Sequence, residues 1–224
     1  MLNVIEIFTS IEGEGKRAGL PAIFVRLEGC NLRCSYCDTK YSYDEEGRQN
    51  CKKMELDEVV QEIRKKGIKN VTITGGEPLI QEQVFDLAAT LCTYNYHINI
   101  ETNGTINVQD VRDAIDIIDT TGLFFTVDYK CPSSGSNNKM DINNFKDLMW
   151  CDVLKFVVGN REDLETAKKV IEEINTKAKI YFSPVFGEIE PKEIVQFLLE
   201  NEMYNCRVQL QLHKFIWPPE QRGV

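Results

Sequence analysis

Residues 28–39 read EGCNLRCSYCDT, and this stretch places Cys30, Cys34 and Cys37 within eight positions. It follows a short apolar run, AIFVRL (22–27), which is typical of a buried strand. The whole chain contains eight cysteines, and the other five are scattered singly. Thiols this close together indicate a metal site more than a disulfide framework. The stretch therefore predicts a metal-binding loop directly after a strand.

Two kinds of metal centre fit three neighbouring cysteines. A structural zinc site is closed by four ligands, and Cys51 would supply the fourth. An iron–sulfur cluster is also held by thiolates, and three cysteines on a four-iron cube leave one iron open to another ligand. The spacing alone favours iron–sulfur and leaves both interpretations open.

The composition excludes two classes of partner. A formal net charge of −9 and a pI near 4.9 do not suit a nucleic-acid backbone, which is bound by a basic face. No apolar run approaches the roughly 20 residues that span a bilayer, and the first residues, MLNVIEIFTSIEGEG, do not resemble a signal peptide. We therefore expect a cytoplasmic protein that binds neither nucleic acid nor a membrane.

Short apolar runs alternate with amphipathic stretches along the chain. The expected strands are residues 22–27, 70–74, 97–101, 123–128, 153–158, 179–183 and 206–212. The expected helices are residues 57–66, 82–94, 107–118, 161–174 and 191–201. This alternation predicts a mostly parallel sheet with helices outside, so we expect an α/β protein with a single-domain, incomplete (β/α) barrel.

Polar clusters follow most of the expected strands. They are EGCNLRC (28–34), GGEP (75–78), TNG (102–104), YKCPSSG (129–135), SPVFGE (183–188) and HKFIWPP (213–219). Because the carboxyl ends of parallel strands meet at one edge of the sheet, these clusters should share one rim. We expect the chemistry of the protein to lie there.

The C-x3-C-x2-C spacing in one such loop, with GGEP in the next, resembles the radical S-adenosylmethionine (SAM) superfamily. The resemblance implies that Cys30, Cys34 and Cys37 hold a [4Fe–4S] cluster whose open iron binds SAM. It also implies that residues 1–224 form a single radical SAM core domain with short N- and C-terminal substrate-binding extensions. In such enzymes the cofactor supplies the radical chemistry, and the protein supplies position and a dry site.

Further stretches resemble one family within that superfamily, the 7-carboxy-7-deazaguanine synthases. They are FTSIEGEGKRAGLPAIFVRLEGCNLRCSYCDT (8–39), TGGEP (74–78), IETNG (100–104), TVDYKCP (126–132) and QLHKFIWPPEQRGV (211–224). The resemblance implies a lyase that converts 6-carboxy-5,6,7,8-tetrahydropterin to 7-carboxy-7-deazaguanine with loss of ammonia, for queuosine or other deazapurine biosynthesis. It also implies Mg²⁺ dependence, a homodimer, and a flavodoxin or ferredoxin as electron donor.

The resemblance also assigns site residues, each carried over by position. The pterin substrate is assigned to Ile11, Glu12, Gly13, Arg26, Thr74 and Pro219. SAM is assigned to Tyr36, Cys37, Asp38, Gly76, Glu77, Asp128, Tyr129, Lys130, Ser183, Pro184, Val185 and Phe186. Mg²⁺ is assigned to the hydroxyl of Thr39, and further candidates on the same rim are Glu101, Asn103 and His213. No side chain is assigned a catalytic role beyond these cofactors.

The residue types suit these roles. A carboxylate at Glu12 accepts from amino and ring N–H groups such as those of a pterin edge, although family members often have Gln here. Arg26 would form a charge-assisted bond to the substrate carboxylate. Mg²⁺ prefers oxygen ligands and takes few from protein, so the Thr39 hydroxyl suffices beside substrate and water. Pro219 matches a near-terminal proline of some members, but this chain continues through EQRGV.

Two other interpretations remain open at this point. A glycyl-radical-enzyme activase has the same cysteine spacing, but it acts on a protein partner and has no use for residues 11–13 or Arg26. A zinc-stabilised binding protein would use Cys51 as its fourth ligand. Metal content separates the zinc protein from the two radical enzymes.

Overall fold

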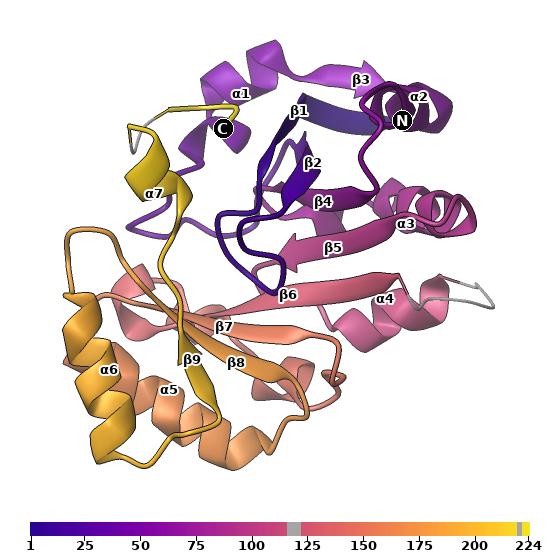
Figure 1. Cartoon of the computed structure of the whole chain (residues 1–224). Coiled ribbons are helices and arrows are strands. Elements are labelled where there is room, and N and C mark those ends of the chain that lie inside the picture. Colours follow the sequence, from indigo (N-terminus) through magenta and orange to yellow (C-terminus); the bar gives the residue numbers. More distant parts are fainter. Residues whose placement is uncertain (116–121, 219–220) are drawn as a thin grey trace.

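The computed structural model describes residues 1–115, 122–218 and 221–224. The described residues form one curved nine-stranded sheet in the order β3-β1-β2-β4-β5-β6-β7-β8-β9 (Figure 1). Its strands are β1 (Leu2–Ile11), β2 (Pro21–Leu27), β3 (Lys52–Met54), β4 (Asn70–Gly75), β5 (His97–Thr102), β6 (Leu123–Lys130), β7 (Val153–Val158), β8 (Lys179–Pro184) and β9 (Cys206–Val208).

Helices cover the outer side of this sheet (Figure 1). The α-helices are α1 (Glu45–Asn50), α2 (Leu56–Lys65), α3 (Gln83–Thr93), α4 (Val108–Ala114), α5 (Arg161–Ile174), α6 (Pro191–Glu200) and α7 (His213–Ile216). Short 3₁₀ turns lie in the loops, at Lys40–Ser42, Pro78–Ile80, Pro132–Ser134, Asn137–Lys139 and Ile142–Phe145. No helix among the described residues is both long and apolar enough to cross a bilayer.

Strand direction confirms the expected fold class. From β2 through β9 every neighbouring pair is parallel, whereas β1 runs antiparallel to both β2 and β3. The strand order begins at β3 and ends at β9, so the sheet curves without closing. The protein is therefore an incomplete (β/α) barrel, and the carboxyl ends of its parallel strands form one rim.

Local sequence explains how the covering helices begin and end. The side chain of Asn160 caps α5 by accepting a hydrogen bond from the Asp163 N–H, and the helix stops at Asn175, whose φ of 45° is left-handed. Helix α6 opens with Pro191 in its first turn and a reciprocal capping box between Glu190 and Glu193.

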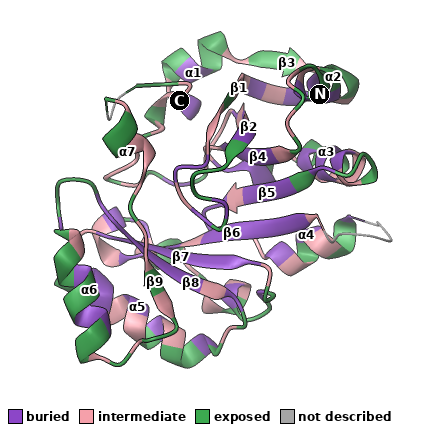
Figure 2. Cartoon of the chain, viewed as in Figure 1, coloured by how far each residue is buried: buried purple, intermediate pink, exposed green. Residues whose placement is uncertain are grey.

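The two faces of the parallel strands differ in polarity. On β4 and β5, residues such as Val71 and Ile98 pack into the core under the helices, and on β7 Phe156 does the same. Each such fully buried side chain contributes about 1.5–3 kcal/mol. Neighbouring positions point to the concave side, because side chains alternate along a strand. There Thr72 and Lys155 are also buried, and Figure 2 shows how much of the strands is enclosed.

Several elements differ from the sequence prediction. Four elements were not expected: strands β1 and β3 and helices α1 and α7. Strand β1 is polar on part of both faces, and the other three are only three to six residues long. The expected strand 206–212 was too long, since β9 ends at Val208, where the following chain turns to contact residues 13–15. Residues 116–118 of the expected helix 107–118 lie outside the described residues.

Candidate active site at the carboxyl ends of the strands

The loop after β2 carries the three clustered cysteines and is anchored to two neighbouring loops. The Glu77 N–H donates to the Gly29 carbonyl at 2.8 Å, which joins it to the GGEP loop after β4. The Ser35 N–H donates to the Ser134 carbonyl at 2.9 Å, which joins it to the loop after β6. Three of the polar clusters expected on one rim are therefore in direct contact.

The three thiols lie near one another and have polar neighbours. The sulfur of Cys30 lies 3.4 Å from the Leu32 N–H nitrogen and 3.9 Å from Asn103 Nδ2, and Cys34 Sγ lies 3.6 Å from Ser136 Oγ. Burial raises the pKa of the Cys30 thiol, and repulsion from Glu77 and the other two cysteines adds to this. A cationic centre would relieve that repulsion.

This donor set fits an iron–sulfur cluster. Three thiols surround the site, and N–H and O–H groups are placed to stabilise the charge of their sulfurs. Among the described residues, no group of three His, Cys, Asp or Glu side chains is compact enough for a single metal ion. The ligands of a four-iron cube, by contrast, stand apart at its separate corners.

Glycine at two positions allows the GGEP loop to approach the cysteine loop. Gly75 has a φ of 141°, and a Cβ there would lie 2.2 Å from the Leu27 carbonyl oxygen. A Cβ on Gly76 would lie 2.1 Å from the Gly29 carbonyl oxygen and 2.7 Å from Cys30 Cβ. No other residue fits without moving the backbone that carries Cys30.

Glu77 joins the GGEP loop to the loop after β5. Its side chain is fully buried, and it accepts hydrogen bonds from Leu79 N at 3.0 Å, Thr102 Oγ1 at 2.8 Å and Asn103 N at 2.6 Å. Burial raises the pKa of this carboxyl to about 7, although the three hydrogen bonds oppose the shift. Contact between Glu77 and the SAM ammonium stays a prediction.

Asp128 lies between two lysines on the concave side of the sheet. Lys130 Nζ is 2.8 Å and Lys155 Nζ is 3.2 Å from its carboxylate oxygens, and Lys155 also pairs with Glu14 at 3.4 Å. Burial alone would raise the pKa of Asp128, but the two ammonium groups outweigh it and hold that pKa below its usual range. The β6–β7 register, which sets Asp128 opposite Lys155, creates this pairing.

Glu101 is, beside Glu77, a second carboxylic acid on this rim whose pKa lies near neutral pH. Thr74 Oγ1 donates to Glu101 Oε2 at 2.8 Å. Burial raises the pKa of Glu101 to about 7; Lys155 lowers it, whereas Glu12 and Glu14 raise it further. A group with this pKa can both hold and release a proton at physiological pH.

Ser183, the last residue but one of β8, has a buried hydroxyl. The residue is fully buried, and within the described part of the chain its Oγ has no hydrogen-bond partner. Pro184 and Val185 follow it in buried positions, and the exposed Phe186 packs edge-on against Phe215 with ring centroids 6.2 Å apart. A buried hydroxyl without a partner at the rim is typical of a ligand contact.

Thr39 and Asp38 follow the third cysteine and contact the C-terminal segment. Thr39 Oγ1 donates to Asp38 Oδ1 at 2.9 Å, and Lys214 of α7 pairs with Asp38 Oδ2 at 3.1 Å. Burial raises the pKa of Asp38, but attraction to Lys214 and the bond from Thr39 bring it below its usual range. Because the Thr39 hydroxyl uses its hydrogen in the bond to Asp38, the lone pairs of its oxygen are available to a cation.

The expected pterin-binding segment is a loop that lies across the concave side. Glu12 is 2% exposed and pairs with Arg17 at 2.6 Å, while Thr72 donates to the same carboxylate oxygen. The Leu212 N–H donates to the Gly13 carbonyl at 2.9 Å, and a Cβ on Gly13 would lie 2.1 Å from His213 Nδ1. The segment therefore contacts the C-terminal segment directly, and a substrate contact by Glu12 stays a prediction.

Arg26 is partly buried on the same side. Its Nε pairs with Glu6 of β1 at 2.8 Å, and its guanidinium carbon lies 5.7 Å from the centre of the Tyr41 ring. Tyr41 also donates to Glu6 at 3.0 Å. The guanidinium carbon of Arg222, in the C-terminal segment, lies 4.1 Å from the centre of the same Tyr41 ring. Thr74 is directly opposite Arg26 in the β2–β4 register.

The sequence reasoning missed Glu6, Glu14, Arg17, Tyr41 and Lys155. Lys155 had a visible signal, since it is a charged residue in the middle of the apolar run VLKFVV (153–158). Arg17 had none, because its partners Glu12 and Thr72 lie in different elements. The expected contact at Pro219 lies outside the described residues.

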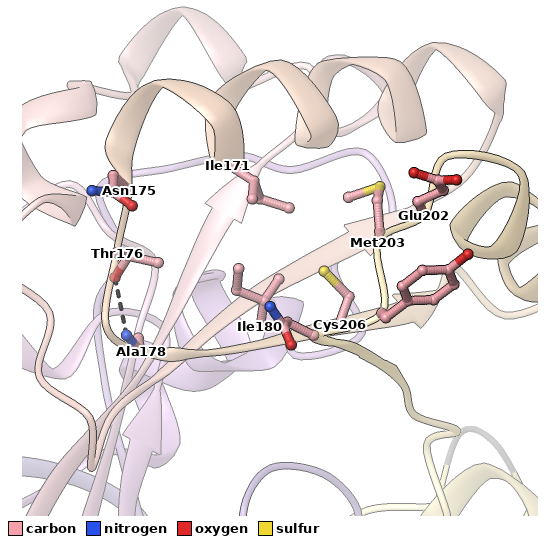
Figure 3. A pocket seen from close by; sticks show the side chains of 10 residues that line it. Ile171, Asn175, Thr176, Ala178, Ile180, Glu202, Met203 and Cys206 are labelled. Carbon is pink, nitrogen blue, oxygen red and sulfur yellow. Dashed lines mark hydrogen bonds between the residues drawn. The ribbon is translucent and has the colours of Figure 1, made fainter.

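A hollow at the opposite end of the sheet has a different character. It has a volume of about 410 Å³ and lies between the end of α5 and the starts of β8 and β9 (Figure 3). Ile171, Ile180, Met203 and Cys206 form its apolar part, and Asn175 lies at its edge. None of the residues expected at the active site lines it.

Comparison with known proteins identifies the family of this chain. Residues 24–200 match the family model for the radical SAM superfamily. The 7-carboxy-7-deazaguanine synthase of Clostridium acetobutylicum is 41% identical, covering 99% of this chain and 98% of its own. That of Methanospirillum hungatei is 43% identical over 97% of this chain and 86% of its own. The crystal structure of QueE from Escherichia coli has the same fold, with a TM-score of 0.70, 23% identity and coverage of 94% and 93%.

A three-cysteine loop and a glycine-rich loop on the rim of an incomplete barrel define a radical SAM enzyme. Membership of this superfamily implies a [4Fe–4S] cluster and SAM as cofactors. Within the superfamily, the chain belongs to the 7-carboxy-7-deazaguanine synthase family. Neither the zinc-stabilised binding protein nor the glycyl-radical activase is favoured by these relatives.

Proposed function

We propose that the protein converts 6-carboxy-5,6,7,8-tetrahydropterin to 7-carboxy-7-deazaguanine and ammonia, for queuosine or another deazapurine. The observation that carries the proposal is that the C-terminal segment contacts both the cysteine loop, through Lys214 and Asp38, and the Ile11–Gly13 segment, through Leu212 and Gly13. The bound cluster and SAM supply the radical that takes hydrogen from the substrate. The side chains bind, orient and exchange protons.

Arg26 is the group that would hold the substrate carboxylate. Its Nε is engaged by Glu6, which fixes the plane of the guanidinium beside Tyr41. The Nη nitrogens remain for a forked contact with a carboxylate. Thr74, 8% exposed and opposite Arg26, is positioned for the next contact along the substrate. The segment from Ile11 to Gly13 would then bind the pyrimidine edge.

Mg²⁺ would bind the Thr39 oxygen and the substrate carboxylate together. The Thr39 hydroxyl donates a hydrogen bond to Asp38, which orients the Thr39 oxygen. The ion pair with Lys214 balances the negative charge of Asp38. We expect Thr39→Ala to weaken stimulation by Mg²⁺ about tenfold while iron content stays unchanged. Thr39→Ser, which keeps the oxygen, is the control. Loss of iron from Thr39→Ala would show that the residue mainly supports the loop.

Glu101 is the group we propose for proton exchange with the reacting pterin. Its pKa of about 7 allows either protonation state at working pH, and the neighbouring Thr74 hydroxyl orients Oε2. Release of ammonia needs a proton on the leaving nitrogen, and a carboxylic acid with a raised pKa can supply one.

SAM would lie between the GGEP loop and the ends of β6 and β8. Tyr36, Cys37 and Asp38 would form one side, Gly76 and Glu77 the next, and the segments Asp128–Lys130 and Ser183–Phe186 the remainder. The buried Ser183 hydroxyl would gain its missing partner from this cofactor. The N- and C-terminal segments would act as substrate-binding extensions of the core domain.

The proposal extends to location, assembly and electron donor. We propose a cytoplasmic homodimer that receives electrons from a flavodoxin or ferredoxin. An anaerobic assay with the carboxytetrahydropterin, SAM, Mg²⁺ and dithionite tests the reaction, with 7-carboxy-7-deazaguanine measured by mass spectrometry. No product from protein with intact cluster and bound SAM would contradict the proposal. Activation of a glycyl-radical enzyme by the same preparation would support the activase instead.

A further inference from the structure

Two side chains outside the cysteine loop reach its sulfur atoms. Asn103, in the loop after β5, places Nδ2 3.9 Å from Cys30 Sγ. Ser136, in the loop after β6, places Oγ 3.6 Å from Cys34 Sγ. Both are nearly enclosed, at 6% and 5% exposure, so water competes little for these contacts.

The orientation of the Asn103 amide follows from its partners. Its Oδ1 accepts from the Thr105 N–H at 3.1 Å, and a backbone N–H can only donate. Oxygen must therefore face Thr105, and Nδ2 must face Asn31 Oδ1, at 2.8 Å, and Cys30. The backbone N–H of Asn103 is held by Glu77 at 2.6 Å. The network therefore directs an N–H donor at the first cluster ligand.

The backbone that carries the Ser136 hydroxyl is held in place in a similar way. Its backbone N–H donates to Ser134 Oγ at 3.0 Å, and its carbonyl accepts from the Lys139 N–H at 3.0 Å. A cysteine bound to iron is a thiolate and has no proton to donate. In the loaded protein the hydroxyl must therefore be the donor, and Cys34 Sγ the acceptor.

We propose that Asn103 and Ser136 raise the reduction potential of the cluster by donating hydrogen bonds to the Cys30 and Cys34 sulfurs. The inference rests on the cluster of the proposed function. Reduction adds one electron to a centre that already has thiolate ligands, and N–H···S and O–H···S bonds stabilise the added negative charge. The two residues thus tune how readily the protein accepts the electron.

The test measures the potential of the cluster and needs no substrate. Ser136→Ala, Asn103→Ala and the double variant are reconstituted anaerobically and titrated with dithionite, with the reduced cluster followed by electron paramagnetic resonance. Each electron comes from dithionite, and the cluster is the group reduced. We expect each single variant to shift the midpoint potential downward, the double variant to shift further, and iron content to be retained.

Two further variants separate this role from support of the loop. Ser136→Thr keeps a hydroxyl at the sulfur and should restore the original potential. Ser35→Ala is the matched control, since Ser35 is next to Cys34 but its hydroxyl donates to the Ser133 carbonyl at 2.7 Å. Unchanged potentials in Ser136→Ala and Asn103→Ala, or an equal shift in Ser35→Ala, would overturn the proposal. Loss of iron from Ser136→Ala would overturn it as well. Failure of turnover with a normal potential would count only against the proposed reaction.

Discussion

The two ends of the parallel sheet are built from the same strands but have opposite chemistry. At the carboxyl ends, Glu77 and Lys155 are buried, Asp128 is partly buried against Lys155, and glycines bring the loops within contact. At the amino ends, the hollow in Figure 3 is lined by Ile171, Ile180 and Met203, among others. Its volume of about 410 Å³ would hold a small ligand, yet the described residues that line it include no cluster of buried charges.

In this protein the candidate active site is distinguished from the hollow by charged groups that come together, and not by open volume. Burying charges is costly unless they are paired, so a protein keeps them where they do chemistry. Loops at the carboxyl ends are free to carry such groups, whereas the amino ends mainly close the core. Variants that act at one end of the sheet only can test this difference.

The largest expected effect compares two cysteines at opposite ends of the barrel. Cys34→Ala removes a cluster ligand, so we expect loss of nearly all iron and all product formation. Cys206→Ala, in the hollow, should retain both, because burial raises the pKa of that thiol to about 11 and keeps it a neutral apolar group. Iron and sulfide analysis after anaerobic reconstitution measures the effect.

Cys51 provides a further control for the same comparison. Iron retained in Cys51→Ala agrees with a three-cysteine cluster. Loss of bound metal in this variant, together with zinc in the parent protein, would contradict the radical SAM interpretation.

The second comparison concerns two glutamates. Glu101→Gln should lower turnover about 10²-fold and remove the dependence of rate on a group titrating near pH 7. Glu202→Gln, at the edge of the hollow, should leave both unchanged. The measurement is the turnover rate as a function of pH with saturating substrate. Equal pH profiles in Glu101→Gln and the parent protein would contradict the assignment of Glu101 as the group that exchanges protons.

Glu101 also predicts how stability depends on pH. Its folded pKa of about 7 lies above the ordinary value of 4.5, so between these pH values the folded protein holds a proton that the unfolded chain has lost. The stability from this group is therefore present below pH 4.5 and is lost as pH rises through 7. The free energy of unfolding of Glu101→Gln, measured with denaturant, should change less with pH across this window than that of the parent protein.

The third comparison concerns two glycines. Gly76→Ala forces a Cβ to within 2.7 Å of Cys30 Cβ, and overpacking of this kind costs about 1–3 kcal/mol. We expect SAM affinity to fall about tenfold to hundredfold. Gly67→Ala, before β4 at the amino end, meets no atom within 4 Å, so the strain of its φ of 71° should lower stability without changing affinity. Equilibrium dialysis with SAM separates the two.

The smallest expected effect concerns two arginines that lie over tyrosine rings. Arg222→Ala releases the C-terminal segment from Tyr41 and from Glu46, which it contacts at 2.7 Å. An exposed contact of this type is worth about 0.5–1 kcal/mol, so the substrate KM should rise about two- to fivefold. Arg64, in the last turn of α2, lies over the ring of Tyr94. Arg64→Ala is therefore the matched control and should leave KM unchanged.

Much of the fold was readable in advance, because it depends on local periodicity. Alternating strands and amphipathic helices predicted β7 and α5 to the residue, at 153–158 and 161–174. Short or edge elements such as β3 and α7 were not readable, because neither is long enough to show a period. The EQRGV end was also unassigned, and only the structure joins Arg222 to Glu46.

The sequence by itself determined the cysteine loop, the order of the rim loops and the family, since these depend on residue types at short spacings. Tertiary structure alone decided which groups meet, such as Lys155 with Asp128, and Asn103 with Cys30 across 73 positions. The physical reason is that spacing along a chain sets local geometry, whereas partners on different strands are chosen by register and packing. Burial then sets their charge, as it does for Glu101.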